Sequence, residues 1–267
     1  MKASSSRHKR IKKIAAIAGA FVFWMAVWQL AHIIVGRDFL LASPAQTLLR
    51  MLRLLGERVF WHSFAMTGLR VLIGFFLAIT LGSVLAVLSS ASPGVKTLLA
   101  PFFGAVRATP VVSFILLALI WMTSGTLPVF TAFLMVLPLA YANLIAGIGS
   151  IDRQLLEMAR LFRFPRRRVL RLIYIPGLAP YFTAACATGL GIAWKAAVAA
   201  EVIARPALSV GNQIHRARIY LDATNLFAWT LAVIIISLVL EKGAVWALQV
   251  LEHRLLRIGR EGGAPHA

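Results

Sequence analysis

The sequence is poor in acidic and, more generally, in charged side chains. Only 9 of its 267 residues are Asp or Glu, and charged residues make up 14% of the chain. An average soluble domain has about 25% charged residues. This small number of charged groups is too low to cover the surface of a water-soluble globule. A soluble enzyme is therefore nearly excluded.

Metal-binding and disulfide-forming residues are also scarce. The single cysteine, Cys186, excludes an intrachain disulfide framework and a cysteine-based metal cluster. The 6 histidines are scattered and show none of the spacings of zinc sites. We therefore expect neither a metal site nor a bound cofactor.

The chain is instead rich in apolar and basic residues. Hydrophobic residues make up 60%, and 28 Lys and Arg give a net charge of +19. The mean hydropathy is +0.83. A basic chain can be a nucleic-acid binder, but in a chain this apolar the excess of positive charge on cytoplasmic loops is the better explanation. The composition predicts a polytopic membrane protein with no nucleic-acid partner.

Apolar runs of the length needed to cross a bilayer, about 20 residues, recur along the chain. We expect an all-α fold with a transmembrane domain over residues 14–251. The first span follows a basic head, as in a signal peptide, but its 22 apolar residues favour a retained helix. Pro101 and Pro110 predict that the third span is broken. The six predicted spans cover 14–35, 63–89, 97–122, 127–149, 178–204 and 226–251.

The distribution of Lys and Arg predicts the orientation of the spans. With the N-terminus inside, 17 of them lie in predicted cytoplasmic segments and 7 in outer segments. Residues 1–13 form a basic cytoplasmic head and residues 252–267 a cytoplasmic tail. Both termini are thus expected in the cytoplasm, in a multi-pass protein of the bacterial inner membrane.

For two of the predicted outer segments, the sequence is compatible with two roles. Ser43 and Pro44 resemble a helix cap followed by proline at the first helical position. The amphipathic helix that follows, to Glu57, lies on the membrane surface or is an ordinary surface helix. The polar segment from Asn212 to Asp222 either receives a substrate-delivery protein or simply connects two spans.

The longest polar interval is the predicted cytoplasmic loop over residues 150–176. It contains seven arginines, and its apolar residues recur at helical spacing on both sides of Pro165. Proline breaks a helix, so the loop should form two short amphipathic helices. From the residues alone, a docking site for a cytosolic partner and an anchor on lipid headgroups are equally supported.

The loop also resembles a known family. Glu157-x-Ala159, followed by Ile175 and Pro176, is similar to the EAA loop of binding-protein-dependent ABC importer permeases, in particular those of the nitrate, sulfonate and taurine type. The resemblance covers roughly residues 38–255. The family usually has glycine where this chain has Arg163. Four further stretches also resemble this family: Leu41–Pro44, Arg70–Phe75, Arg107–Pro110 and Gly191–Glu201.

This resemblance implies a type I ABC importer permease fold and a transport subunit without enzymatic activity. The implied partners are cytosolic ABC ATPase subunits, an extracytoplasmic substrate-binding protein, a second permease copy in a homodimer, and membrane lipid. The chain lacks the Gly-rich phosphate loop that binds ATP, so a separate subunit hydrolyses the nucleotide. The implied ATPase-coupling residues are Glu157, Ala159, Arg163, Pro165 and Pro176.

Polar residues inside the spans are candidates for the translocation path, because charges there are costly unless paired or hydrated. Lys195, with neighbouring Trp194, lines the path and meets an anionic solute, or Lys195 pairs with another helix. Glu201 has Arg205 at the favoured spacing of four residues. Arg107 guards the cytoplasmic side of the path or extends to the lipid headgroups.

The resulting hypothesis is an ATP-driven importer of a small anionic, sulfonate-, nitrate- or taurine-like solute. The alternative is an ion-coupled secondary transporter or channel that needs no ATPase. That alternative predicts buried acidic relays, yet Glu201 and Glu241 are the only carboxylates within the spans, both near their ends. No set of catalytic residues supports a membrane-embedded enzyme.

Overall fold

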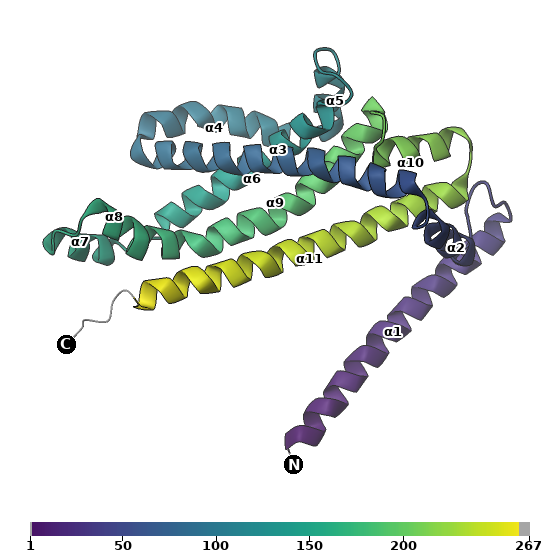
Figure 1. The fold of residues 1–267 in the computed structure, drawn as a ribbon, viewed down its shortest axis with the longest axis horizontal. Helices are drawn as coiled ribbons and strands as arrows, with labels where there is room; N and C mark the ends of the chain where they lie inside the picture. The colour runs from purple at the N-terminus through teal and green to yellow at the C-terminus, as the bar shows by residue number, and fades with distance from the viewer. Residues whose placement is uncertain (1, 262–267) are drawn as a thin grey trace. The chain divides into compact units, whose positions relative to one another are not determined.

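The computed structural model consists of helices joined by short connections (Figure 1). It describes the backbone of residues 2–261 and the side chains of residues 15–247 and Val250, so the side chains of the predicted basic head (1–13) and tail (252–267) all lie outside the described part. The elements are α1 (Lys2–Val35), α2 (Pro44–Leu54), α3 (Arg58–Ala91), α4 (Pro93–Ala108), α5 (Val111–Ala118), α6 (Leu127–Gly149), α7 (Arg153–Leu161), α8 (Arg166–Val169), the π-helical turn η1 (Leu170–Tyr174), α9 (Ile175–Ala204), α10 (Val210–Ile219) and α11 (Ala223–Glu261).

Five helical segments in the described part of the chain are long and apolar enough to cross a membrane. A sixth candidate is the pair α4 and α5, which passes the same test together but is bent by 100°. The bend lies at Thr109 and Pro110, because proline disfavours helical geometry in the residue before it. Pro101, the other proline from which a break was predicted, does not end the helix and lies inside α4. The five segments are Ala15–Val35, Arg58–Ala91, Leu127–Gly149, Arg166–Ala204 and Ala223–Ala247.

The chain forms two compact units. The first comprises Met1–Trp61 and Gln213–Val233. In it, the predicted start of α2 is confirmed: Ser43 Oγ accepts from the amide of Gln46 at 3.2 Å, and the Gln46 side chain accepts from the amide of Ser43 at 3.0 Å. This reciprocal capping satisfies two donors at the helix end. The connection before α2 is held to α1, since Trp28 Nε1 donates to the carbonyl of Ala42 at 3.1 Å.

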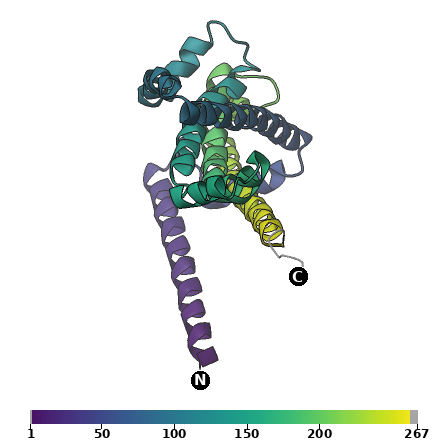
Figure 2. The ribbon, with the colours of Figure 1, turned by 90° about the vertical axis from the view of Figure 1, so that its left-hand side faces the viewer.

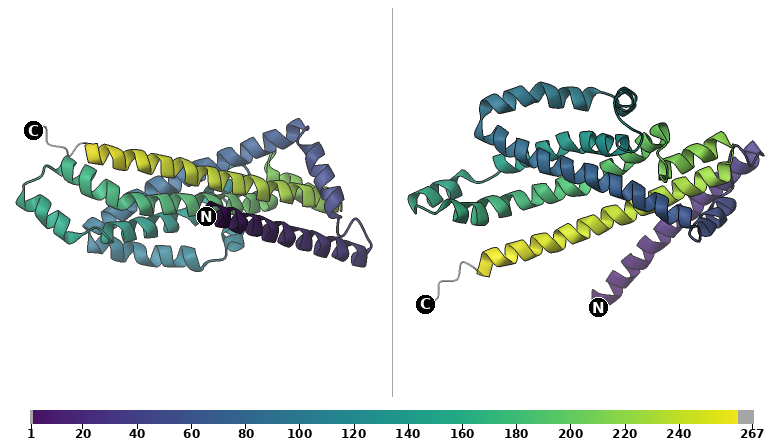
Figure 3. Two further views of the ribbon diagram at one scale, coloured as in Figure 1. Left: turned by 90° about the horizontal axis from the view of Figure 1, so that it is seen from below. Right: turned by 45° about the horizontal axis from the view of Figure 1, so that its top comes forward.

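The second unit comprises His62–Asn212 and Ile234–Ala267. Its helices α6 and α9 run side by side, and α7 and α8 lie where the chain turns from one to the other (Figure 3). Gly74 and Gly82 let α3 approach α6 closely. A Cβ on Gly74 would collide with the carbonyl of Val129, and one on Gly82 would lie 2.8 Å from Ala140 Cβ. Small residues at such contacts are typical of packed membrane helices.

Candidate functional site

The loop between α6 and α9 carries the residues predicted to couple to an ATPase. Figure 2 views the end of the second unit at which α7 and α8 lie. Helix α7 begins after Asp152, whose carboxylate accepts from the amide of Gln154 at 2.8 Å. Ala159 faces inward with only 2% of its surface exposed, whereas Leu161 and Phe162 are 82% and 70% exposed. The end of α7 thus presents an uncovered apolar surface.

Glu157 lies on the exposed side of α7. Together with Arg160 and Leu161 it lines a shallow depression of about 420 Å³. The spacing allows local ion pairs with Arg153 or Arg160, but Glu157 forms no ion pair or hydrogen bond with any side chain that the structure describes. Its carboxylate is therefore available to a partner molecule.

Arg163 ends α7 in a left-handed conformation, with φ of 50°. Its amide donates to the carbonyl of Arg160 at 3.0 Å, and the amide of Phe164 donates to the carbonyl of Ala159 at 2.9 Å. This pair of bonds is the Schellman motif, which usually has glycine at the left-handed position. At the position where the family usually has glycine, this chain thus has an arginine in the left-handed conformation that glycine adopts most easily.

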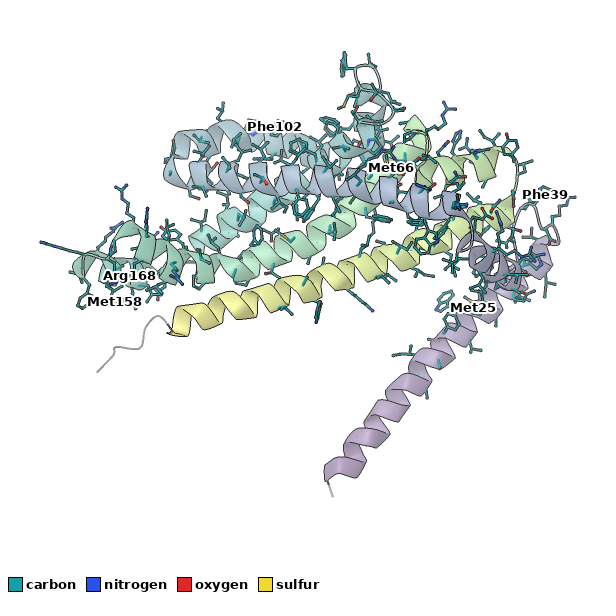
Figure 4. The ribbon with its side chains drawn as sticks, in the orientation of Figure 1. Met25, Phe39, Met66, Phe102, Met158 and Arg168 are labelled. Carbon is teal, nitrogen blue, oxygen red and sulfur yellow. The ribbon has the colours of Figure 1, made fainter. Side chains whose placement is uncertain are left out.

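Pro165 separates the two short helices as predicted, because it caps the N-terminus of α8. Beside it, the guanidinium of Arg168 lies over the ring of Phe164, 5.3 Å from its centroid. A cation over an aromatic face at this distance is attractive. Figure 4 shows Arg168 and Met158 together at this end of the molecule. The contact holds α8 against the residue that follows the turn.

Pro176 lies in the first turn of α9, which continues from α8 through the π-helical turn η1. Proline has no amide hydrogen to donate to the carbonyl four residues earlier. The chain accommodates it with a wider turn, in which the amide of Ile175 donates to the carbonyl of Leu170. From α8 onward, the loop between α6 and α9 is therefore connected to α9 by continuous helix.

A groove of about 1080 Å³ lies between this loop and the ends of the neighbouring helices. Most of its lining residues are apolar, and we call them the floor. The lining also includes Arg160, Arg163 and Arg166, which are all exposed and which we call the rim. We call the groove as a whole the loop groove. The other residues that line it are Val87, Ser90 and Ala91 of α3, Ile148 of α6, and Leu156, Ala159, Phe164, Val169, Leu170, Tyr174, Ile175 and Leu178.

A buried ion pair connects α3 to the end of α9. Glu201 is fully buried, and Arg70 Nη1 donates to its Oε1 at 2.9 Å. Thr67 Oγ1 lies 2.8 Å from Glu201 Oε2, and the amide of Gly211 donates to that same oxygen at 3.2 Å. The amide of Val210 in turn donates to Thr67 Oγ1 at 3.1 Å. The carboxylate is thus both charge-paired and hydrogen-bonded, as a buried charge requires.

This network differs from the pairing suggested by the sequence. Arg205 is exposed and ends α9 in a left-handed conformation, with φ of 55°, while Glu201 pairs with Arg70. Because Glu201 is fully buried, it does not face solvent in this conformation. The available signal was that Arg70 and Glu201 each place a charge in an apolar span, where charges tend to pair with one another. The sequence offered no signal for Thr67.

The two neighbours Trp194 and Lys195 point in different directions from α9. Trp194 is 2% exposed and stacks on Phe64, with ring centroids 6.2 Å apart. Lys195 is exposed. No ion pair joins Lys195 to any side chain of the described residues. Lys195 is thus an accessible charge within a segment that is apolar enough to span the membrane.

Arg107 lies at the end of α4 and reaches across to α6. Its Nη2 donates to the carbonyl of Pro138 at 3.0 Å, and Arg107 is otherwise exposed. Part of its hydrogen-bonding capacity is thus used in a contact between two helices.

Comparison with known proteins gives one family and several relatives. Residues 78–257 match the family described as the inner membrane component of binding-protein-dependent transport systems. The taurine transport system permease protein TauC of Escherichia coli is 26% identical over 91% of this chain and 87% of its own length. The riboflavin transport system permease protein RibX of Chloroflexus aurantiacus is 31% identical over 85% of each chain.

A solved structure shares the fold. The chain superposes on one from the crystal structure of an amino acid ABC transporter with histidines, with a TM-score of 0.59. The superposition covers 77% of this chain and 97% of the other, at 19% sequence identity.

Proposed function

The chain belongs to the family of binding-protein-dependent transport system inner membrane components, and from this membership we propose how it couples to ATP, what it carries and how it assembles. It is the membrane-spanning permease subunit of an ABC importer, a multi-pass protein of the bacterial inner membrane and not an enzyme. Permeases of this family act with an ABC ATPase and a substrate-binding protein.

The proposed coupling element is α7 with the turn that follows it. The supporting observation is the unpaired carboxylate of Glu157 beside the exposed side chains of Leu161 and Phe162. An exposed apolar surface next to an unpaired charge is typical of a protein interface, where truncating the charge costs about 2–5 kcal/mol. Ala159, Arg163, Pro165 and Pro176 hold this surface in place. Closure of the ATPase on ATP would move α7, and with it α9.

Purification with the ATPase subunit tests this proposal. Glu157→Ala should weaken ATPase association by about 30-fold or more, which is the affinity equivalent of about 2 kcal/mol. Gln154→Ala, at another exposed position on the same helix, serves as the matched control and should leave association unchanged. Equal ATPase binding by both variants would refute a role for Glu157.

The proposed solute is a small anion such as a sulfonate, and Lys195 is its contact in the translocation path. The supporting observations are the accessible Lys195 in an apolar span and the likeness to a taurine permease. The path is expected between two copies of the chain, on the face that carries Lys195. Arg107 contributes positive charge at the cytoplasmic end of the same path.

Uptake of a short alkanesulfonate by proteoliposomes, with ATPase and binding protein present, tests the solute. Lys195→Met should lower uptake at least about tenfold, since a charge-assisted hydrogen bond contributes roughly 1.5–3 kcal/mol. Lys195→Arg should restore part of it, and Lys242→Met, an exposed lysine of α11, is the control. Full sulfonate uptake by Lys195→Met contradicts the assignment. The likeness to a riboflavin permease favours an uncharged heterocycle as the second candidate solute.

The proposed assembly is a homodimer with both termini in the cytoplasm. The exposed faces of single helices, such as Phe76 and Leu77 of α3, leave room for lipid and for a second copy. Native mass spectrometry of the purified complex should find two identical permease chains with two ATPase subunits. A complex that holds this chain and a different permease chain contradicts it.

A further inference from the structure

The loop groove combines an apolar floor with a basic rim, and it adjoins the proposed coupling surface, with which it shares Ala159, Arg160 and Arg163. The side chains that line it come from the end of α3, the end of α6, the coupling loop and the start of α9. Leu161 and Phe162, the most exposed apolar residues of the proposed ATPase surface, do not line the groove. Its volume of about 1080 Å³ is at the upper end for small-molecule sites, which span roughly 300–1,000 Å³.

The charges along the groove have one sign. Arg160, Arg163 and Arg166 line it, and no Asp or Glu is among its lining residues. A guanidinium offers a planar set of donors that binds phosphate through two parallel hydrogen bonds. The backbone turn at Arg163, closed by the bonds of the Schellman motif, places these arginines on consecutive parts of one short segment. The rim is therefore suited to an organic phosphate.

The apolar floor of the loop groove further restricts the class of ligand that fits it. Val87, Ile148 and Leu178 belong to segments that are long and apolar enough to span the membrane. Arg160 and Arg163 belong to the loop that follows α6, and Arg166 is the first residue of the segment Arg166–Ala204. The groove therefore runs from apolar span ends to basic loop residues. A soluble phosphate would use only the rim, but a molecule with an anionic head and a hydrocarbon chain matches both parts. Basic pockets between membrane helices on the cytoplasmic side bind anionic lipid headgroups.

We propose that the loop groove binds an anionic phospholipid of the cytoplasmic leaflet, with its phosphate on the three arginines and one acyl chain along the apolar floor. The proposal rests on the cytoplasmic orientation of the loop given above. The lipid contacts the coupling loop and the ends of α3 and α9 at once. Its presence therefore stabilises the loop against the spans and makes the position of α7 depend on anionic lipid.

Two matched double variants test the site in the purified complex of permease and ATPase. Arg160→Gln with Arg166→Gln removes two rim charges and leaves the turn at Arg163 intact. Arg153→Gln with Arg167→Gln removes the same charge from exposed arginines of the same segment that do not line the groove. The probe is phosphatidylglycerol, compared with phosphatidylcholine, and the readout is the bound lipid counted by native mass spectrometry.

The wild-type complex and the control variant should retain phosphatidylglycerol in preference to phosphatidylcholine. The rim variant should lose affinity for it by about 25-fold, since each basic residue near an anionic lipid surface contributes a factor of about five. Ala91→Trp, which places a bulky side chain in the groove, should reduce lipid retention without changing any charge. Failure of this variant to fold would leave the charge variants as the test.

Three results overturn the proposal. Equal phosphatidylglycerol affinity of the rim and control variants means that the lipid is held by general charge. Displacement of the lipid by glycerol phosphate at equal concentration means that the apolar floor plays no part. Loss of ATPase association in the rim variant with unchanged lipid binding means that the groove faces the ATPase. If lipid binding fails while ATPase association and uptake persist, only the lipid proposal fails and the coupling proposal stands.

Discussion

The buried pair of Arg70 and Glu201 gives the sharpest stability prediction. Glu201 is fully buried and Arg70 is 9% exposed, so removing either partner leaves a charge in an apolar interior. Such a loss typically costs about 3–5 kcal/mol. Arg70→Met and Glu201→Ala should each lower the unfolding midpoint by roughly 10 °C, using about 2–4 °C per kcal/mol for a chain of this size. Glu201→Gln should cost less, because an amide oxygen still accepts from Thr67 and Gly211.

The single cysteine provides the assay. Cys186 is buried, with 6% of its surface exposed, so a thiol-reactive dye labels it as the protein unfolds. The labelling rate of the purified complex, followed during heating, reports the midpoint for each variant. Arg205→Gln is the matched control, because Arg205 is the sequence-favoured partner of Glu201 but is exposed. It should leave the midpoint unchanged.

The double variant Arg70→Met with Glu201→Leu tests whether the two residues stabilise the protein as a pair. Replacing both partners with apolar side chains removes the stranded charge, so its midpoint should lie well above that expected from the sum of the single effects. Strict additivity, or single variants with unchanged midpoints, would show that the pair does not stabilise the junction of α3, α9 and α10.

Three further predictions concern backbone geometry and topology. Gly211→Ala should destabilise the protein by about 1–3 kcal/mol, because the new Cβ would collide with Glu201 Cβ and lie 2.6 Å from the amide nitrogen of Val202. The control is Gly104→Ala, which has open space around it and should not destabilise the protein in the same assay. Arg163→Gly should raise stability by about 1 kcal/mol by relieving the left-handed arginine, and a lowered midpoint would contradict that explanation. In a Cys186→Ala background, a membrane-impermeant maleimide should label Leu161→Cys only from the cytoplasm; labelling from outside reverses the proposed orientation.

The sequence predicted the features that depend on nearby residues. Ser43 and Pro44 start α2 because a side-chain cap and a proline at the first position both act within one turn. Pro165 separates α7 from α8 for a similarly local reason. The break in the third apolar region was expected at its prolines, but the bend of 100° between α4 and α5 depends on what each helix packs against.

Features that join distant segments could not be predicted in the same way. Arg70 lies 131 positions before Glu201, and the nearer Arg205 satisfied the helical spacing rule. Only tertiary packing decides between the two partners, by burying Glu201 on the side that faces α3. The loop groove likewise has no local signal, because its lining comes from four separate stretches of the chain. The left-handed turn at Arg163 was not predicted, because the resemblance showed only that the family usually has glycine at this position.

In the proposed mechanism, ATP acts through α7 to drive the import of a small solute. The direct measurement is uptake by proteoliposomes that contain this chain with its ATPase, with the loaded binding protein outside and ATP on the ATPase side. Accumulation should require both ATP and binding protein, be lost in Glu157→Ala and persist in Gln154→Ala. Accumulation by the permease alone, driven by an ion gradient without ATP, would contradict this mechanism.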